Sequence, residues 1–156
     1  MSNFPAVFDL ATLASGDGST GFVLNGIDAG DTSGFSVSSA GDVNGDGIDD
    51  LIIGALRGGE LSTGESYVVF GNALGFAPEF ELSTLAIGDG STGFVLNGID
   101  GYDASGASVS SAGDVNGDGF DDLIIGAFGA DPGGDSSAGE SYVAVSYTHL
   151  TLPTKA

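Results

Sequence analysis

The stretch Asp42-Val-Asn-Gly-Asp-Gly-Ile-Asp-Asp50 occurs a second time, with one substitution, as Asp114-Val-Asn-Gly-Asp-Gly-Phe-Asp-Asp122. Each copy places oxygen-bearing side chains at positions 1, 3, 5 and 9, and a glycine at position 6. A hard cation such as Ca²⁺ favours this arrangement, because it takes several oxygen ligands and because glycine permits the tight turn between them. The pattern therefore predicts two Ca²⁺ sites, one in each copy.

The position of each residue in the loop indicates which of them would be ligands. Neighbouring side chains on an extended chain point to opposite sides, so Asp49 and Asp50 cannot both face one ion. We expect Asp50, at position 9, to be the ligand, and Asp49 and its counterpart Asp121 to point outward. The carbonyl oxygen at position 7 would add a further ligand. The predicted metal ligands are Asp42, Asn44, Asp46, Ile48 and Asp50 in the first loop, and Asp114, Asn116, Asp118, Phe120 and Asp122 in the second.

Other acidic loops fit the pattern less well. An EF-hand has glutamate at position 12, where this chain has Ile53 and Ile125, and it needs helices on both sides of the loop. A dockerin-like loop, which shares the opening residues, is excluded for the same two reasons. An Asp-, Asn- and Gly-rich turn that binds no metal is the remaining alternative.

The repetition extends well beyond the two loops. Residues 9–54 and 81–126 are identical at 38 of 46 positions. A period of this length is typical of solenoids, propellers or other repeat arrays. We therefore divide the chain into a first repeat at 1–71, a second at 72–146, and a tail at 147–156 that matches neither. The tail resembles translated adapter sequence, with a divergent strand end as the alternative.

Short apolar segments bounded by Gly, Asp or Asn predict strands within each unit. In the first unit they are residues 21–24, 35–38, 51–55 and 67–70, and the run Leu51-Ile-Ile-Gly-Ala55 is typical of a strand buried on both faces. Four short antiparallel strands form one propeller blade. The expected fold is all-β, with two four-stranded antiparallel blades of a β-propeller and a calcium loop in each. Residues 10–13 and 82–85 could form a helical turn or a loop.

Composition excludes several classes of function. The chain has 22 acidic residues against Arg57 and Lys155, a formal net charge of −20, which would repel nucleic acid and anionic membrane surfaces. No apolar run is long enough to span a bilayer, so we expect no membrane insertion, and no signal peptide is visible at the N-terminus. The chain has no cysteine, and its one histidine, His149, lies in the tail, so we expect no catalytic triad and no enzyme activity.

The segments Ser33–Ala55 and Ser105–Ala127, which contain the two loops, resemble the FG-GAP repeat of integrin α-subunit β-propellers and of many secreted or surface bacterial proteins. The resemblance covers residues from about 9 to 143. Leu56 and Phe128 replace the proline that is usual in the family, and Ala107 replaces the aromatic residue found at Phe35. The resemblance implies that each calcium loop joins the first two strands of a blade, that the ion is mainly structural, and that ligands bind at the opposite face.

Together these features predict a non-catalytic, calcium-binding module for extracellular adhesion or for protein or glycan recognition, located outside the cell or on its surface. One alternative is an accessory propeller domain of a secreted, phospholipase-like enzyme whose catalytic part lies elsewhere. Another is a self-assembling surface protein. A propeller needs more blades than two repeats supply, so the expected partners include further blades of a longer chain or a homo-oligomeric ring.

Overall fold

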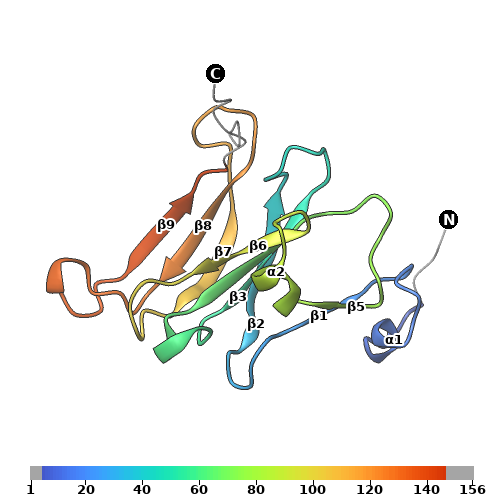
Figure 1. The fold of residues 1–156 in the computed structure, drawn as a ribbon, viewed down its shortest axis with the longest axis horizontal. Coiled ribbons are helices and arrows are strands. Elements are labelled where there is room, and N and C mark those ends of the chain that lie inside the picture. The colour runs from blue at the N-terminus through green and yellow to red at the C-terminus, as the bar shows by residue number, and fades with distance from the viewer. Residues whose placement is uncertain (1–4, 147–156) are drawn as a thin grey trace.

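The computed structural model describes residues 5–146. Its main body consists of two antiparallel sheets that pack against each other through their faces (Figure 1). The first sheet has the strand order β2-β3-β4-β6 and the second the order β7-β8-β9. A separate pair, β1 and β5, is parallel. The strands are β1 (Val23–Asn25), β2 (Ser33–Gly41), β3 (Asp50–Ala55), β4 (Glu65–Val69), β5 (Glu79–Glu81), β6 (Gly93–Asn97), β7 (Ser105–Gly113), β8 (Asp122–Ala127) and β9 (Glu140–Ala144).

The all-β expectation is confirmed, but the expectation of two complete four-stranded blades is wrong for the described residues. The fourth strand of the first sheet is β6, which comes from the second sequence repeat. Its sequence counterpart β1 joins neither large sheet and pairs with β5 instead. As a result the second sheet has three strands within residues 5–146. Sequence periodicity locates strands but does not say which sheet the first strand of a unit joins, because that depends on contacts between units.

The strand at 51–55, which was predicted to be buried on both faces, does separate two apolar layers. Ile52 contributes to a cluster between the two sheets, together with Val68, Leu123 and Ile125. Its neighbour Ile53 lies in a second cluster on the other face of the first sheet. The second sheet packs onto the first through β7, which lies against β2 and β3. Burial of these aliphatic side chains stabilises the fold by about 1.5–3 kcal/mol for each fully buried residue.

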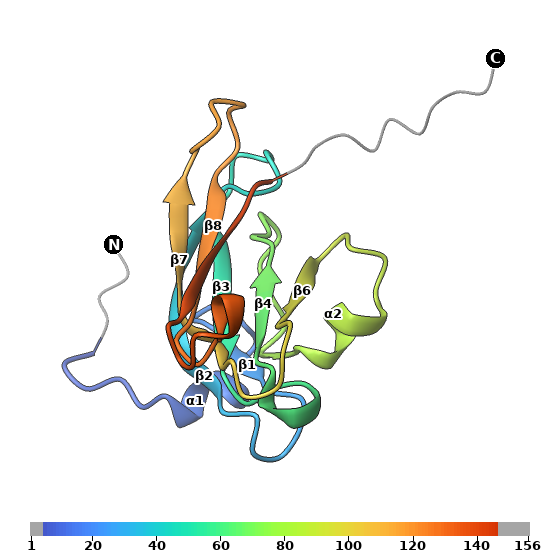
Figure 2. The same ribbon diagram turned by 90° about the vertical axis from the view of Figure 1, so that its left-hand side faces the viewer.

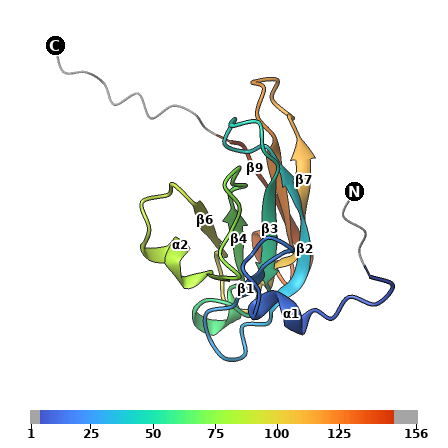
Figure 3. The same cartoon turned by 90° about the vertical axis from the view of Figure 1, so that its right-hand side faces the viewer.

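The segments left open as helical turns or loops are short helices, α1 (Ala11–Ala14) and α2 (Ser83–Ile87). In α2 the apolar side chain of Leu85, with Leu82 just before the helix, is buried in the second cluster. Together with β1 and β5, α2 lies on the side of the first sheet that faces away from the second (Figures 1 and 3). The single-turn 3₁₀ segments are η1 (Glu60–Ser62) and η2 (Pro132–Gly134).

Candidate metal site

The two acidic loops connect the first two strands of each sheet, β2 to β3 and β7 to β8. Both lie at the same end of the molecule, with the second loop beside the first (Figure 2). This confirms the expectation that each acidic loop joins the first two strands of its sheet. It also gathers the acidic side chains of both repeats at one end.

The aspartate at position 1 organises each loop through backbone hydrogen bonds. Asp42 Oδ1 accepts hydrogen bonds from the N–H groups of Gly45 (2.7 Å) and Asp46 (3.0 Å), and its Oδ2 accepts one from Gly47 (2.9 Å). Asp114 makes the same three contacts in the second loop. These N–H groups, that of Gly119 foremost, lower the pKa of Asp114 from its ordinary value. The charged form of the Asp114 carboxylate is therefore favoured.

The side chains at positions 3 and 5 also accept hydrogen bonds from backbone N–H groups of the loop. Asn44 Oδ1 accepts a hydrogen bond from the N–H of Asp46 (2.9 Å), and Asp46 Oδ1 accepts one from the N–H of Ile48 (2.9 Å). Asn44 Nδ2 also donates to Asp46 Oδ2 (3.1 Å). The second loop repeats all three bonds among Asn116, Asp118 and Phe120.

The aspartate at position 9 is buried and ties the loop to the third strand of its sheet. Asp50 is fully buried, and its two oxygens accept hydrogen bonds from the N–H groups of Val43 (2.9 Å) and Gly71 (2.8 Å). Asp122 makes the equivalent bonds to Val115 and Ser146. Burial raises the pKa of Asp50, and the charges of Asp46 and Asp42 raise it further, against the lowering effect of its two hydrogen bonds.

The donor set suits Ca²⁺, although the side chains are not drawn together around a point. All the predicted ligand atoms are oxygens, and the charges of Asp42 and Asp46 are close enough to act on Asp50. A cation would relieve this repulsion. Within residues 5–146, however, no three acidic, histidine or cysteine side chains are close enough together to form a metal cluster. The carboxylates instead accept hydrogen bonds from backbone N–H groups, in their own loops and, for Asp50 and Asp122, also at Gly71 and Ser146.

The structure also shows a contact between the loops that the sequence did not predict. Asp121 was expected to point outward, but its Oδ2 accepts a hydrogen bond from the N–H of Asp42 (2.9 Å), and its own N–H donates to the Asp42 carbonyl (3.1 Å). The expectation was wrong for Asp121 because a second repeat lies beside the first, whereas Asp49 is exposed as expected. Phe120 lies over Gly45, where an added Cβ would be 2.0 Å from the ring. The two loops differ in sequence only at Ile48 and Phe120, and this difference was the sequence feature that could have indicated a contact between the loops.

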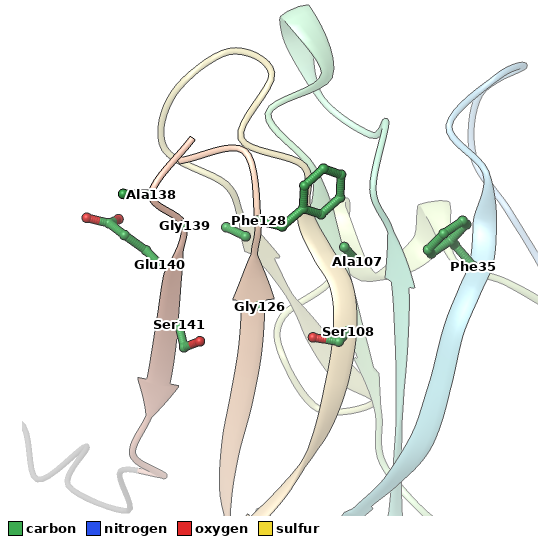
Figure 4. A pocket seen from close by; sticks show the side chains of 10 residues that line it. Phe35, Ala107, Ser108, Gly126, Phe128, Ala138, Gly139, Glu140 and Ser141 are labelled. Atoms are coloured by element: carbon green, nitrogen blue, oxygen red, sulfur yellow. The ribbon is translucent and has the colours of Figure 1, made fainter. Parts of the chain in front are cut away.

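At the other end of the strands lies an open pocket of about 540 Å³, lined by residues of both sheets (Figure 4). Its aromatic side chains, Phe35 on β2 and Phe128 after β8, are 61% and 66% exposed. Ala107, which replaces an aromatic residue in the repeat, also lines the pocket, as does Glu140. Because Phe35 is exposed, the change to Ala107 alters this surface and does not remove a core contact.

No helix among the described residues is both long and apolar enough to cross a membrane.

Comparisons with known proteins agree with the repeat pattern. The FG-GAP repeat family model matches residues 33–69 and 105–144. The chain is 33% identical to integrin alpha-5 of Xenopus laevis over 113 residues, which covers 70% of this chain and 10% of that protein. It is 34% identical to integrin alpha-3 of Cricetulus griseus over 124 residues, covering 78% of this chain and 11% of that protein. The chain thus spans about a tenth of the length of these curated relatives.

Proposed function

This chain is a member of the FG-GAP repeat family, with two integrin α-like copies, and from that premise we propose that it is a calcium-stabilised, non-catalytic module for extracellular adhesion or for protein or glycan recognition. The single observation that carries the proposal is the repeated loop whose oxygen side chains stand at positions 1, 3, 5 and 9. Both copies have the same internal hydrogen bonds, which supports the proposal of one ion in each loop.

We infer that Ca²⁺ binds between the position 1, 3, 5 and 9 side chains and the position 7 carbonyl of each loop. The residues are Asp42, Asn44, Asp46, Ile48 and Asp50, and Asp114, Asn116, Asp118, Phe120 and Asp122. When bound, the ion supplies a double positive charge that offsets the repulsion among three aspartates. The chain's own contribution is to orient the oxygens and to link the loop to the third strand through Asp50 and Gly71.

Recognition of a partner is assigned to the end of the sheets opposite the acidic loops. That end has an open pocket with two exposed phenylalanines and the carboxylate of Glu140 nearby. Aromatic faces supply apolar area for a protein side chain or a sugar ring, and a carboxylate accepts hydrogen bonds from hydroxyl or amide groups. A role at the cell surface or outside the cell fits the similarity to integrin α-chains and the strongly acidic composition.

Titration calorimetry and thermal unfolding with and without chelator test the calcium part of the proposal. We expect two binding events and a higher melting temperature with Ca²⁺, because a ligand that binds only the folded state stabilises it by about 2.7 kcal/mol at 100 times its Kd. The double variant Asp46→Ala with Asp118→Ala should lose both effects. The variant Asp49→Ala with Glu60→Ala removes the same charge from exposed positions and should retain them.

An absence of heat with Ca²⁺, together with an unchanged melting temperature in chelator, would contradict calcium binding. Recognition is tested separately by binding to immobilised matrix proteins and to a glycan array. The variant Phe35→Ala with Phe128→Ala should lose binding, while the exposed control Leu74→Ala should keep it.

A further inference from the structure

Within the part of the chain that the structure describes, strand β9 leaves one edge of the second sheet unpaired. In the first sheet, β4 has β3 on one side and β6 on the other, whereas among residues 5–146 β9 is paired with β8 alone. The two strands have almost the same sequence, Glu65-Ser-Tyr-Val-Val69 in β4 and Glu140-Ser-Tyr-Val-Ala144 in β9. An exposed edge of this kind can accept another strand through its free N–H and C=O groups.

The chain also carries a second copy of the strand that fills this place in the first sheet. Residues 21–25 and 93–97 have the identical sequence Gly-Phe-Val-Leu-Asn. Strand β6 lies antiparallel to β4 with the register Glu65↔Asn97, Tyr67↔Val95 and Val69↔Gly93. Residues 21–25 could therefore pair with β9 in the same register, with the same side chains opposite one another at all but one position.

The backbone groups of residues 21–25 that this pairing needs point away from β5, the strand with which β1 already pairs. The pairing of β6 with β4 shows which groups these are. Bonds from Phe70 N–H to the Thr92 carbonyl (3.0 Å) and from Gly98 N–H to the Gly64 carbonyl (2.7 Å) flank the β4–β6 pair. Hydrogen-bonded and non-hydrogen-bonded residue pairs alternate along antiparallel strands. Phe94 and Leu96 are therefore the residues of β6 whose backbone groups bond to β4 in the stretch between these two flanking bonds.

In β1 the alternate residues are used for β5. The Val23 N–H donates to the Pro78 carbonyl (2.9 Å), and the Asn25 carbonyl accepts from the Leu82 N–H (3.1 Å). The backbone groups of Phe22 and Leu24, the counterparts of Phe94 and Leu96, consequently point to the other edge of β1. Within the described residues β1 pairs only with β5, so that edge is open.

Strand β1 already has the position that such pairing requires. Leu24 packs against the cluster that contains Ile53 of β3. Its counterpart Leu96 packs against the cluster that contains Ile125, the residue of β8 equivalent to Ile53. The strand therefore lies against the first sheet as β6 lies against the second, and a second molecule could present it without rearranging.

We propose that residues 21–25 of one copy of this chain add to the β9 edge of a second copy, antiparallel, with Asn25 opposite Glu140, Val23 opposite Tyr142 and Gly21 opposite Ala144. This register puts Val23 on the same face as Tyr142. A groove of about 180 Å³ lies there beside β9, lined by apolar side chains that include Leu96, Ile99 and Tyr142. The side chain of Val23 would enter that groove.

The exposed face of the second sheet supports the same association. Ile52 and Val68 are fully buried between the sheets, whereas their counterparts Ile124 and Val143 are 38% and 50% exposed. The incoming copy would cover Ile124 and Val143 with its own first sheet, as the second sheet covers Ile52 and Val68 within one molecule. Exposed apolar area of this kind marks interaction surfaces.

The acidic loops supply a matching contact at the other end of the interface. Within one molecule Asp121 and Phe120 of the second loop lie on Asp42 and Gly45 of the first. On the second loop the equivalent Gly117 has nothing within 4 Å of an added Cβ. The exposed Asp49 of the incoming copy, with Ile48 beside it, would lie there. The contact is head-to-tail, so among the described residues each copy keeps one unpaired edge, and assembly continues to a ring or a linear chain.

Two features weaken the association relative to the internal pairing. The edge-to-face contact between Phe70 and Phe94 (5.9 Å) would become a contact between Phe22 and Val145. The net charge of −20 also makes copies repel, and salt screens this repulsion over about 8–10 Å at physiological ionic strength. We therefore expect self-association to increase as sodium chloride is raised, opposite to an association driven by charge attraction.

Disulfide trapping in the full chain tests the register, because the native sequence has no cysteine. Position 25 and position 140 would form a pair without mutual backbone hydrogen bonds, in which the Cβ atoms lie closest. A mixture of the single variants Asn25→Cys and Glu140→Cys should form a disulfide-linked heterodimer. A mixture of Asn25→Cys and Ser141→Cys should not, because adjacent side chains point to opposite faces. Glu65→Cys with Asn97→Cys in one chain, the equivalent internal pair, is the control that should close within the monomer.

Sedimentation across a concentration series tests the association without cysteine. Wild type should increase in mass with concentration. Ser141→Pro should remain monomeric, because it removes an N–H that points away from β8, and Ser141→Ala should behave as wild type. If wild type stays monomeric at high salt, or the 25–140 mixture yields no more heterodimer than the 25–141 mixture while the internal pair closes, the proposal is wrong. In that case the β9 edge accepts a strand from another source or none.

Discussion

The carboxylate of Asp121 accepts a hydrogen bond from the backbone N–H of Asp42 at 2.9 Å, and the Asp121 N–H donates to the Asp42 carbonyl at 3.1 Å. These two bonds join the acidic loops of the two repeats. The counterpart of Asp121 in the first loop, Asp49, is exposed. One sequence position therefore has two different structural roles, and paired substitutions can separate them.

We expect Asp121→Ala to lower the free energy of unfolding by about 1–2 kcal/mol, because it removes a charged acceptor from a partly buried N–H. Asp49→Ala should change it by less than about 0.5 kcal/mol, as is usual for an exposed position. Urea denaturation in chelator, at a protein concentration where the chain is monomeric, measures both. Equal effects of the two substitutions would contradict a bond that contributes to stability between the loops.

Gly45→Ala should destabilise the fold more than Gly117→Ala. Both residues have a positive φ, 77° and 78°, so the conformational penalty of alanine is about the same, roughly 1–2 kcal/mol. Only at Gly45 would the new Cβ meet another group, the ring of Phe120 at 2.0 Å. Thermal unfolding of the two variants gives the difference. In a Phe120→Ala background, Gly45→Ala should cost less stability than it does in the wild type, and an equal cost in both backgrounds would show that the ring is not the obstacle.

Ser66→Ala should stabilise the chain by about 1 kcal/mol. The Ser66 hydroxyl is buried and has no hydrogen-bond partner among the described residues. An unpaired buried hydroxyl costs about 1–3 kcal/mol, which the substitution removes at the expense of a small cavity. Its counterpart Ser141 is exposed, so Ser141→Ala should have little effect on the melting temperature of the monomer. A lower melting temperature for Ser66→Ala would show that the hydroxyl has a partner.

Alkaline pH should destabilise the first sheet through Tyr67. Its hydroxyl donates to Glu65 Oε2 at 2.5 Å, and burial, followed by this bond, raises the pKa of Tyr67 well above its ordinary value. Because the pKa of Tyr67 is higher in the folded protein than in the unfolded chain, where a tyrosine has a pKa of about 10, its neutral form stabilises the fold. This stabilisation is complete below about pH 10 and is lost progressively as the pH rises above it. Tyr67→Phe should therefore reduce the dependence of unfolding free energy on pH between about 10 and 11. The control Tyr102→Phe, at an exposed side chain, should keep the wild-type dependence, and an unchanged slope for Tyr67→Phe would contradict the prediction.

The sequence alone determined the features that depend on local chemistry and short-range periodicity. The acidic residues and glycines of the loops predicted a tight turn between two strands, and the apolar run at 51–55 predicted a strand buried on both faces. Both follow from side-chain type and from alternation along one segment of chain. Near-identity of the repeats likewise predicted two similar units.

The tertiary structure decided the features that depend on how one unit meets the next. Identical strands at 21–25 and 93–97 lie in different sheets, and equivalent residues such as Asp49 and Asp121, or Ile52 and Ile124, differ in exposure. No local pattern distinguishes them, because each pair has nearly the same sequence around it. Their difference arises because one copy of each surface is covered by the neighbouring repeat and the other copy is not.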